Sequence, residues 1–202
     1  QNLGKNFELG LIRNHYVGRT FIEPTQKIRS LGVKLKLNAN KSTIKNKKII
    51  IAREKGYHGS TLLAASVSGK ERDRTYLDTL NDFVRFLPDI NPSKRGKDIT
   101  MEKWCDRKVA DLEEVILKNG AHNVAAFIAE PVLASGGVII PPKNYHQKTM
   151  EICKKYDVLY ISDEVVTGFG RLGSWFASES SFGIIPDIIT CAKGLTSGYF
   201  PM

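Results

Sequence analysis

Residues 158–202 read VLYISDEVVTGFGRLGSWFASESSFGIIPDIITCAKGLTSGYFPM, and this stretch decides the expected fold. The apolar run 158–161 leads almost directly to Asp163, which predicts a buried strand that carries a carboxylate at its carboxyl end. A second apolar run, 188–190, ends shortly before Lys193 and predicts another strand of the same kind. Because ligands of open α/β sheets bind at the carboxyl ends of the strands, the two strands would present an acid and an amine to one crevice.

The pairing of Asp163 with Lys193 points to one cofactor. Pyridoxal phosphate needs a lysine amine for its Schiff base and an aspartate that keeps its pyridine nitrogen protonated. Each residue also has an ordinary structural explanation, with Lys193 as a solvated surface lysine and Asp163 with Glu164 as an acidic pair that caps a helix. The small and apolar neighbours Cys191 and Ala192 favour the functional interpretation of the lysine.

Four ordered blocks in this stretch resemble the signature of a known enzyme family. They are Tyr-Ile-Ser-Asp-Glu-Val at 160–165, Gly-Phe-Gly-Arg at 168–171, Pro-Asp-Ile-Ile at 186–189 and Ala-Lys-Gly-Leu-Thr-Ser-Gly at 192–198. From about Lys47 to Met202, the chain resembles the class III aminotransferases of the ω-amino acid:pyruvate type, which are pyridoxal-phosphate enzymes of fold type I. The resemblance implies an α/β large domain with a mostly parallel sheet flanked by helices. The domain would be incomplete here, because family members continue well beyond the Schiff-base lysine.

The resemblance also implies roles for residues of the signature. Lys193 would form the Schiff base with pyridoxal phosphate and move the proton during catalysis, and Asp163 would hold the pyridine nitrogen. Val165 lies two positions further on, and on a strand this spacing would return it to the face of Asp163. There it would pack against one side of the cofactor ring.

Two further motifs supply the remaining expected cofactor-binding residues. Tyr57 and His58 belong to the turn Gly-Tyr-His-Gly-Ser, and in the family an aromatic ring at the position of Tyr57 stacks on the cofactor. Glu130 follows the apolar run 124–129 and would join the hydrogen-bond network of the cofactor, where a buried charge needs a partner. The structural alternatives are a surface turn for Tyr57 and His58 and a solvated loop carboxylate for Glu130. No metal site is expected.

Periodicity predicts most of the other elements. Apolar runs predict strands at 49–51 and 124–129, and helical spacing predicts helices at about 60–68, 101–118 and 144–156. The order strand, helix, strand over 124–161 predicts a βαβ unit with a parallel sheet. The polar segment 72–100 contains Pro88, Pro92 and Gly96 and is interpreted as a long loop.

The sequence supports a domain assignment for only one of two parts of the chain. Residues 47–202 are assigned to a partial pyridoxal-phosphate-binding large domain. Residues 1–46 are poorly assigned, with short strand candidates at 10–12, 20–22 and 31–37. The Gly-Ser loop that holds the cofactor phosphate in the family is not recognisable in this first part.

Composition limits the alternatives. The net charge of +9 is spread along the chain, so a solvated basic surface is favoured over nucleic-acid binding, which is kept as a minor alternative. No apolar run is long enough to cross a bilayer, and no membrane partner is expected. The three scattered cysteines argue against a disulfide framework and favour a reducing compartment, the cytoplasm.

The expected function is transamination that depends on pyridoxal phosphate, from an ω-amino acid or amine to a keto acid such as pyruvate. The expected partners are a small-molecule amino donor, a keto-acid acceptor and, in the full-length protein, a second copy of the chain. Two alternatives stay open. One is an aminomutase or decarboxylase on the same scaffold, and the other is a truncated remnant without activity.

Overall fold

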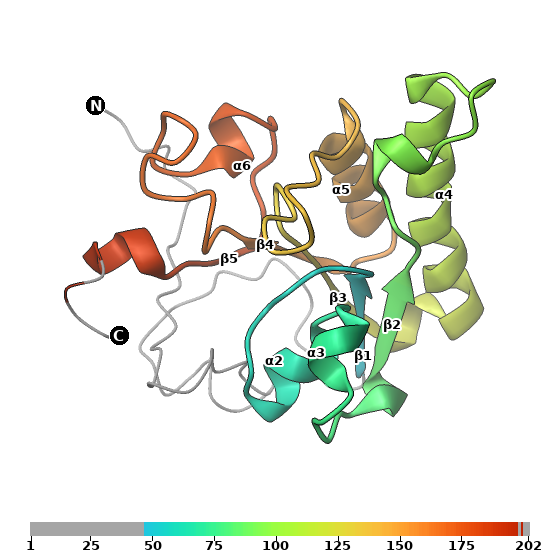
Figure 1. Cartoon of the computed structure of the whole chain (residues 1–202). Helices are drawn as coiled ribbons and strands as arrows, with labels where there is room; N and C mark the ends of the chain where they lie inside the picture. Colours follow the sequence, from blue (N-terminus) through green and yellow to red (C-terminus); the bar gives the residue numbers. More distant parts are fainter. Residues whose placement is uncertain (1–46, 198, 200–202) are drawn as a thin grey trace.

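A five-stranded parallel sheet with helices on both faces forms the centre of the computed structural model, which describes residues 47–197 and 199 (Figure 1). The strand order is β2–β1–β3–β4–β5. The strands are β1 (Ile49–Arg53), β2 (Val84–Leu87), β3 (Val124–Ala129), β4 (Leu159–Asp163) and β5 (Ile188–Thr190). The prediction of a mostly parallel α/β sheet is confirmed. The strand candidates within 1–46 lie outside the described residues.

The helices connect these strands in the order expected of an α/β domain. They are α2 (Leu62–Val67), α3 (Glu71–Arg74), α4 (Met101–Asn119), α5 (Tyr145–Lys155) and α6 (Ala177–Ser180). The short 3-10 helices are η1 (Asn81–Phe83), η2 (Pro92–Lys94), η3 (Ala121–Asn123) and η4 (Lys193–Thr196). The predicted helices at 60–68, 101–118 and 144–156 therefore correspond to α2, α4 and α5. Within the described residues, no helix is long and apolar enough to cross a membrane.

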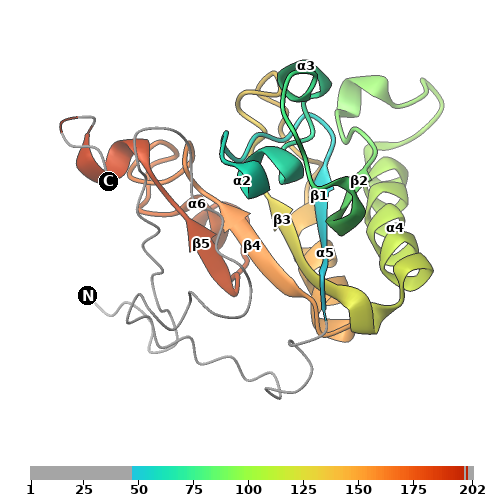
Figure 2. The ribbon, with the colours of Figure 1, turned by 90° about the horizontal axis from the view of Figure 1, so that it is seen from below.

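Alternation along each strand separates two apolar cores. Ile51, Phe127 and Tyr160 point to the face where α4 and α5 pack. Their neighbours on the strands, such as Ile50 and Ile161, point to the opposite face, against Val67 of α2. Because both faces are covered, the central strand β3 is buried over its whole length and its sequence is a continuous apolar run (Figure 2).

Helix α4 shows how local sequence sets the ends of an element. Thr100 accepts a hydrogen bond from the backbone amide of Lys103 at 3.2 Å, which caps the amino end. Gly120 ends the helix with φ of +77°, a conformation that glycine adopts without strain. Between them, Leu112 and Ile116 are fully buried against the sheet.

The interpretation of 72–100 as a loop is wrong in one respect, because β2 lies within it. Val84 and Leu87 are buried, and the strand pairs in parallel with β1 from Ile50↔Val84 to Arg53↔Leu87. An edge strand is bonded on one side only, so it tolerates Arg85 and the adjoining Pro88, which made the segment resemble a loop.

The register of the sheet places the carboxyl ends of β3, β4 and β5 side by side. Ala129 pairs with Ser162 across β3 and β4, and Asp163 pairs with Thr190 across β4 and β5. Consequently the residues that follow β3, β4 and β5 begin at the same edge. The turn after β1 also starts from this edge, since all four strands run in one direction.

Candidate functional site

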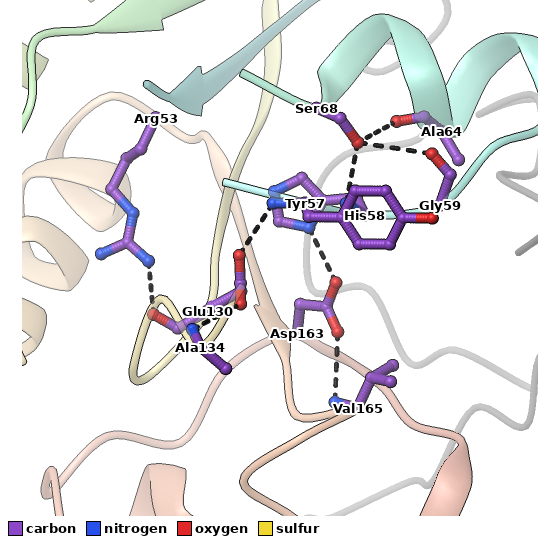
Figure 3. A network of polar contacts seen from close by, with 10 residues as sticks. All are labelled: Arg53, Tyr57, His58, Gly59, Ala64, Ser68, Glu130, Ala134, Asp163 and Val165. Atoms are coloured by element: carbon purple, nitrogen blue, oxygen red, sulfur yellow. Dashed lines mark hydrogen bonds and ion pairs between the residues drawn. The ribbon is translucent and has the colours of Figure 1, made fainter. Parts of the chain in front are cut away.

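Asp163 lies at the centre of a buried polar network at this edge (Figure 3). It is the last residue of β4, and 3% of its surface is exposed. Its Oδ2 atom lies 2.7 Å from Nδ1 of His58, and its Oδ1 accepts the backbone amide of Val165 at 3.1 Å. These two contacts fix the orientation of the carboxylate at the edge of the sheet.

His58 is a buried member of the network, so the alternative of a surface turn is wrong for this residue. Only 3% of His58 is exposed, and its backbone amide donates to Oγ of Ser68 at 2.8 Å. With Asp163 ionised, Nδ1 of the imidazole carries the hydrogen that lies between the two side chains. His58 thus connects the turn after β1 to the end of β4.

Tyr57 is half-buried beside His58, and its backbone amide donates to Oε1 of Glu130 at 2.9 Å. Its phenol oxygen lies 2.9 Å from Oγ of Ser60. The ammonium of Lys70 lies 6.0 Å from the centre of the Tyr57 ring. The ring is held at its backbone and at its hydroxyl, which gives it a defined orientation at the site.

Glu130 follows β3 and is the second buried carboxylate of the site, with 5% of its surface exposed. It has the partners that a buried charge requires, because Oε1 accepts the amide of Tyr57 and Oε2 accepts the amide of Ala134 at 3.2 Å. Burial raises the pKa of the Glu130 carboxyl above its ordinary value, and Asp163 adds to this rise, whereas His58 opposes it. The alternative of a solvated loop carboxylate is therefore wrong.

Val165 reaches the site for a reason other than the one the sequence suggested. The expected alternation along a strand fails, because β4 ends at Asp163 and the chain enters a turn. Val165 is instead placed by its own amide, which bonds back to Oδ1 of Asp163, and 5% of the residue is exposed. The aspartate thus positions the apolar side chain directly.

Lys193 follows β5 at the same edge, three residues after Thr190, the register partner of Asp163. It is exposed and adopts the left-handed region with φ of +48°. A non-glycine residue in this region costs free energy, so the surrounding structure holds the backbone there. A Cβ on the next residue, Gly194, would lie 2.7 Å from Cβ of Phe169, which requires glycine beside the lysine.

Glu164 has a separate structural role from its neighbour Asp163. It is completely buried, and its carboxylate accepts the amides of Ala177 and Ser178, the first residues of α6, at 3.0 and 2.6 Å. The hydroxyls of Thr167 and Ser178 donate to it at 2.6 Å each. The alternative of a helix-capping acid is therefore correct for Glu164, and the contacts of Asp163 lie elsewhere.

Two residues of the network were not anticipated from the sequence. Arg53, the last residue of β1, is 1% exposed and donates through Nη2 to the backbone carbonyl of Glu130. Its guanidinium carbon also lies 5.9 Å from the centre of the Tyr145 ring. Ser68 ends α2 and receives the amide of His58. A charged residue at the end of the apolar run 49–52 was the available signal for Arg53, whereas Ser68 had none.

This combination of fold and site is typical of the pyridoxal-phosphate enzymes of fold type I. A parallel sheet carries a buried aspartate and a lysine at the carboxyl edge of two adjacent strands, with an aromatic ring nearby. The family model described as Aminotransferase class-III matches residues 30–202. The chain belongs to the class III aminotransferases.

Individual relatives agree with this assignment. Gamma-aminobutyrate transaminase 1, mitochondrial, from Oryza sativa subsp. indica is 47% identical over 167 residues, which cover 78% of this chain and 30% of the rice protein. Putrescine–pyruvate aminotransferase of Pseudomonas aeruginosa is 44% identical over 156 residues, which cover 77% of this chain and 34% of the relative. The chain therefore spans about a third of the length of the curated relatives it matches.

Solved structures of the same family share the fold. The crystal structure of the omega transaminase from Pseudomonas jessenii in complex with PMP aligns with a TM-score of 0.74 and 39% sequence identity. The alignment covers 79% of this chain and 36% of that chain. The match confirms fold type I for the described part of the chain.

Class III aminotransferases use pyridoxal phosphate, and the residues of this chain fit that cofactor. The buried carboxylate of Asp163 suits a protonated pyridine nitrogen, because an opposite charge in a site with little water favours the protonated form. Lys193, an exposed residue at the same edge of the sheet, supplies an amine of the kind that forms a Schiff base. Within the described residues, no cluster of histidine, cysteine and acidic side chains is arranged as a metal site.

Proposed function

We propose that this chain contributes the cofactor-binding part of an aminotransferase that moves an amino group from an ω-amino acid or amine to a keto acid such as pyruvate. The observation that carries the proposal is the convergence of Asp163 and Lys193 at one edge of the sheet. The buried contact between His58 and Asp163 supports it, because such a network fixes an acid for a defined ligand.

Asp163 would hold a proton on the pyridine nitrogen through Oδ1 or Oδ2. Pyridoxal phosphate, when bound, supplies a ring that accepts electrons from the bond broken at the substrate carbon. The imidazole of His58 keeps the carboxylate oriented, and the amide of Val165 holds its other oxygen. This arrangement needs no reorganisation when charge develops, which is the main source of electrostatic catalysis.

Lys193 would carry out the proton transfers. Its Nζ atom would accept the proton from the substrate carbon and return it to the product side. Tyr57 and Val165 would contact the opposite sides of the ring and restrict its movement, with the Tyr57 backbone fixed by Glu130. Glu130 would accept a hydrogen bond at the edge of the ring through a carboxylate oxygen.

The amino donor and acceptor are proposed from the relatives. One relative is named for γ-aminobutyrate and another for putrescine and pyruvate. These names support an amine or ω-amino acid as donor and pyruvate as one acceptor. Catalysis is proposed to occur in a homodimer of the full-length protein, as is typical of the family.

A cytoplasmic location is also proposed. All three cysteines, Cys105, Cys153 and Cys191, are free and buried, which is consistent with a reducing compartment. Several plant relatives are named as mitochondrial or chloroplastic proteins. Fluorescence microscopy of the complete natural protein, tagged at its carboxyl end, would decide between the cytoplasm and an organelle.

The cofactor site is tested by absorbance spectroscopy after incubation with pyridoxal phosphate. The expected result is a new visible band, followed by fixation of the label on Lys193 after borohydride reduction and peptide mapping. Lys193→Ala should abolish the band and the label. Lys154→Ala is the matched control, because Lys154 is an exposed lysine on α5, and this variant should keep both.

A result without a visible band, or with the label distributed over surface lysines, would contradict the proposal and favour the inactive-remnant alternative. Amino-donor screening with γ-aminobutyrate and putrescine against pyruvate then tests the reaction itself. Release of product without a net exchange of amino groups would favour the aminomutase or decarboxylase alternative.

A further inference from the structure

The turn that carries Tyr57 and His58 is attached to the end of helix α2. The amide of His58 donates to Oγ of Ser68 at 2.8 Å, and the amide of Gly69 donates to the carbonyl of Gly56 at 2.9 Å. The amide of Lys55 donates to the carbonyl of Gly69 at 3.1 Å. The Ser68–Gly69 junction therefore holds the turn on the side of α2, opposite its contacts with Glu130 and Asp163.

Arg74, the last residue of α3, holds this junction from the other side. Its Nη1 atom donates to the backbone carbonyls of Ser66 and Ser68 at 2.9 and 3.1 Å. Its Nη2 atom donates to Oδ1 of Asn81 at 2.5 Å. The guanidinium carbon lies 4.7 Å from the centre of the Phe86 ring on the edge strand β2.

We propose that Arg74 is a positioning residue for the cofactor site. Arg74 holds the end of α2 in place, and the end of α2 in turn holds the turn at 56–58. This turn places Tyr57 against the cofactor and His58 against Asp163. This inference rests on the proposed function for its consequence in catalysis, but the structural chain of contacts is independent of that function.

A cavity next to the turn explains why this contact matters. The cavity has a volume of about 150 Å³ and is lined by Tyr57, Ser68, Arg74 and Leu77, among others. Close packing does not therefore support the turn on this side. On the cavity side, hydrogen bonds at the Ser68–Gly69 junction hold the turn in place of close packing, so we expect the loss of the arginine to loosen it.

The geometry of the contact requires arginine. A guanidinium has donors in a fixed fork, so one group can bond two carbonyls and a side-chain amide while its flat face stacks on an aromatic ring. A lysine at the same position would keep the charge and could reach a subset of these acceptors. Arg74→Lys should therefore give the same direction of change as Arg74→Gln and a smaller magnitude.

The experiment compares Arg74→Gln with Arg72→Gln in the complete natural protein. Arg72 is the matched control, because it lies on the same helix, its side chain is 81% exposed and it pairs with the neighbouring Asp73. Two properties are measured. The first is amide hydrogen exchange of residues 54–60 without cofactor, and the second is the circular dichroism induced in bound pyridoxal phosphate, per mole bound.

Arg74→Gln is expected to speed exchange of residues 54–60 by at least roughly tenfold, which corresponds to about 1.4 kcal/mol of local stability. Peptides from β3 and α4 should keep their exchange rates, which separates a local effect from general loss of stability. The induced circular dichroism should fall by at least about half, because the ring loses its fixed environment. Arg72→Gln should change neither property beyond roughly twofold, as expected of an exposed ion pair.

Unchanged exchange and unchanged dichroism in Arg74→Gln would overturn the proposal, as would equal changes in Arg72→Gln. If the parent protein binds no pyridoxal phosphate, the proposed function fails, and the exchange measurement still decides the positioning role. If Arg74→Gln does not fold, Arg74→Lys is measured in the same way, and parent-like exchange at 54–60 in that variant overturns the inference.

Discussion

His58 and Asp163 are 105 positions apart in the sequence, yet Nδ1 of the imidazole lies 2.7 Å from Oδ2 of the carboxylate. Both side chains are almost completely buried, at 3% and 2% exposure. The contact joins the turn after β1 to the end of β4, across the intervening strand β3. It thereby connects the two parts of the chain that are expected to contact the cofactor.

Replacement of His58 by leucine should destabilise the protein by about 3 kcal/mol, because a buried carboxylate loses a donor that water cannot replace. His58→Asn should recover part of this loss, since its amide nitrogen can take the place of Nδ1. The measurement is urea unfolding followed by fluorescence. The exposed His122 is the control, and His122→Leu should change the free energy of unfolding by less than about 0.5 kcal/mol. Equal effects of leucine at the two positions would contradict the assigned contact.

Glu164→Gln should release the segment between β4 and α6. The carboxylate accepts four hydrogen bonds, two on each oxygen, and an amide can accept on only one of its two terminal atoms. A loss of about 2–4 kcal/mol is expected, together with faster tryptic cleavage at the exposed Arg171. Glu179→Gln is the control, because Glu179 is exposed on α6, and cleavage at Arg171 should keep its parent rate. Equal protection of Arg171 in both variants would contradict this role of Glu164.

His146 should make the protein sensitive to acid. Its Nε2 lies 3.0 Å from the carbonyl of Pro131 and its Nδ1 lies 2.8 Å from the hydroxyl of Tyr160, so the neutral ring donates to the first and accepts from the second. Burial, with a smaller contribution from Arg53, lowers the pKa of His146 from 6.5 to about 3.

The lowered pKa of His146 determines how the stability of the protein changes with pH. The neutral ring is favoured in the folded protein, so its contribution to stability is complete above about pH 6.5 and is lost as the pH falls towards 3. Between these limits the loss amounts to about 1.4 kcal/mol per pH unit. Urea midpoints measured from pH 7 to pH 4 should show this slope in the parent and a flatter one in His146→Gln. His122→Gln should keep the parent slope, and an identical slope in His146→Gln would show that another group is responsible.

Local sequence predicted the regular elements where a single feature dominates. The strand at 124–129 is predicted with its observed limits, because an uninterrupted apolar run in a parallel sheet has few other interpretations. The helix at 101–118 differs from α4 by one residue, because Gly120 marks its end. The acid and the lysine were found because each comes shortly after an apolar run, 158–161 and 188–190.

Contacts between distant residues could not be predicted in this way. Strand alternation gave the wrong reason for Val165, because the chain leaves the sheet at Asp163 and the amide turns back to the carboxylate. Ser68 ends a short helix like many serines, and only the fold shows that it receives the amide of His58. Arg74 lies in a segment whose polarity concealed an edge strand. In each case the decisive interaction is tertiary, and single-sequence periodicity contains no information about it.

Gly69 provides a test of the junction that does not depend on the cofactor. A Cβ at this position would lie 2.2 Å from the carbonyl oxygen of Arg53 and 2.9 Å from Cα of Glu54. Both atoms are backbone at the end of β1, and the sheet prevents them from moving apart. Gly69→Ala should therefore cost at least about 3 kcal/mol of unfolding free energy, at or above the upper end of ordinary overpacking.

The matched control is Gly96→Ala, because a Cβ there would meet only side-chain atoms of Ile99, at 3.4 and 3.6 Å. Its effect should lie within about 0.5 kcal/mol of the parent. If Gly69→Ala changed the free energy of unfolding as little as Gly96→Ala, the backbone at 53–56 would have to shift readily to make room for the new Cβ. The turn with Tyr57 and His58 would then not be fixed by its junction with α2, and both the orientation of His58 towards Asp163 and the inferred role of Arg74 would lose their structural basis.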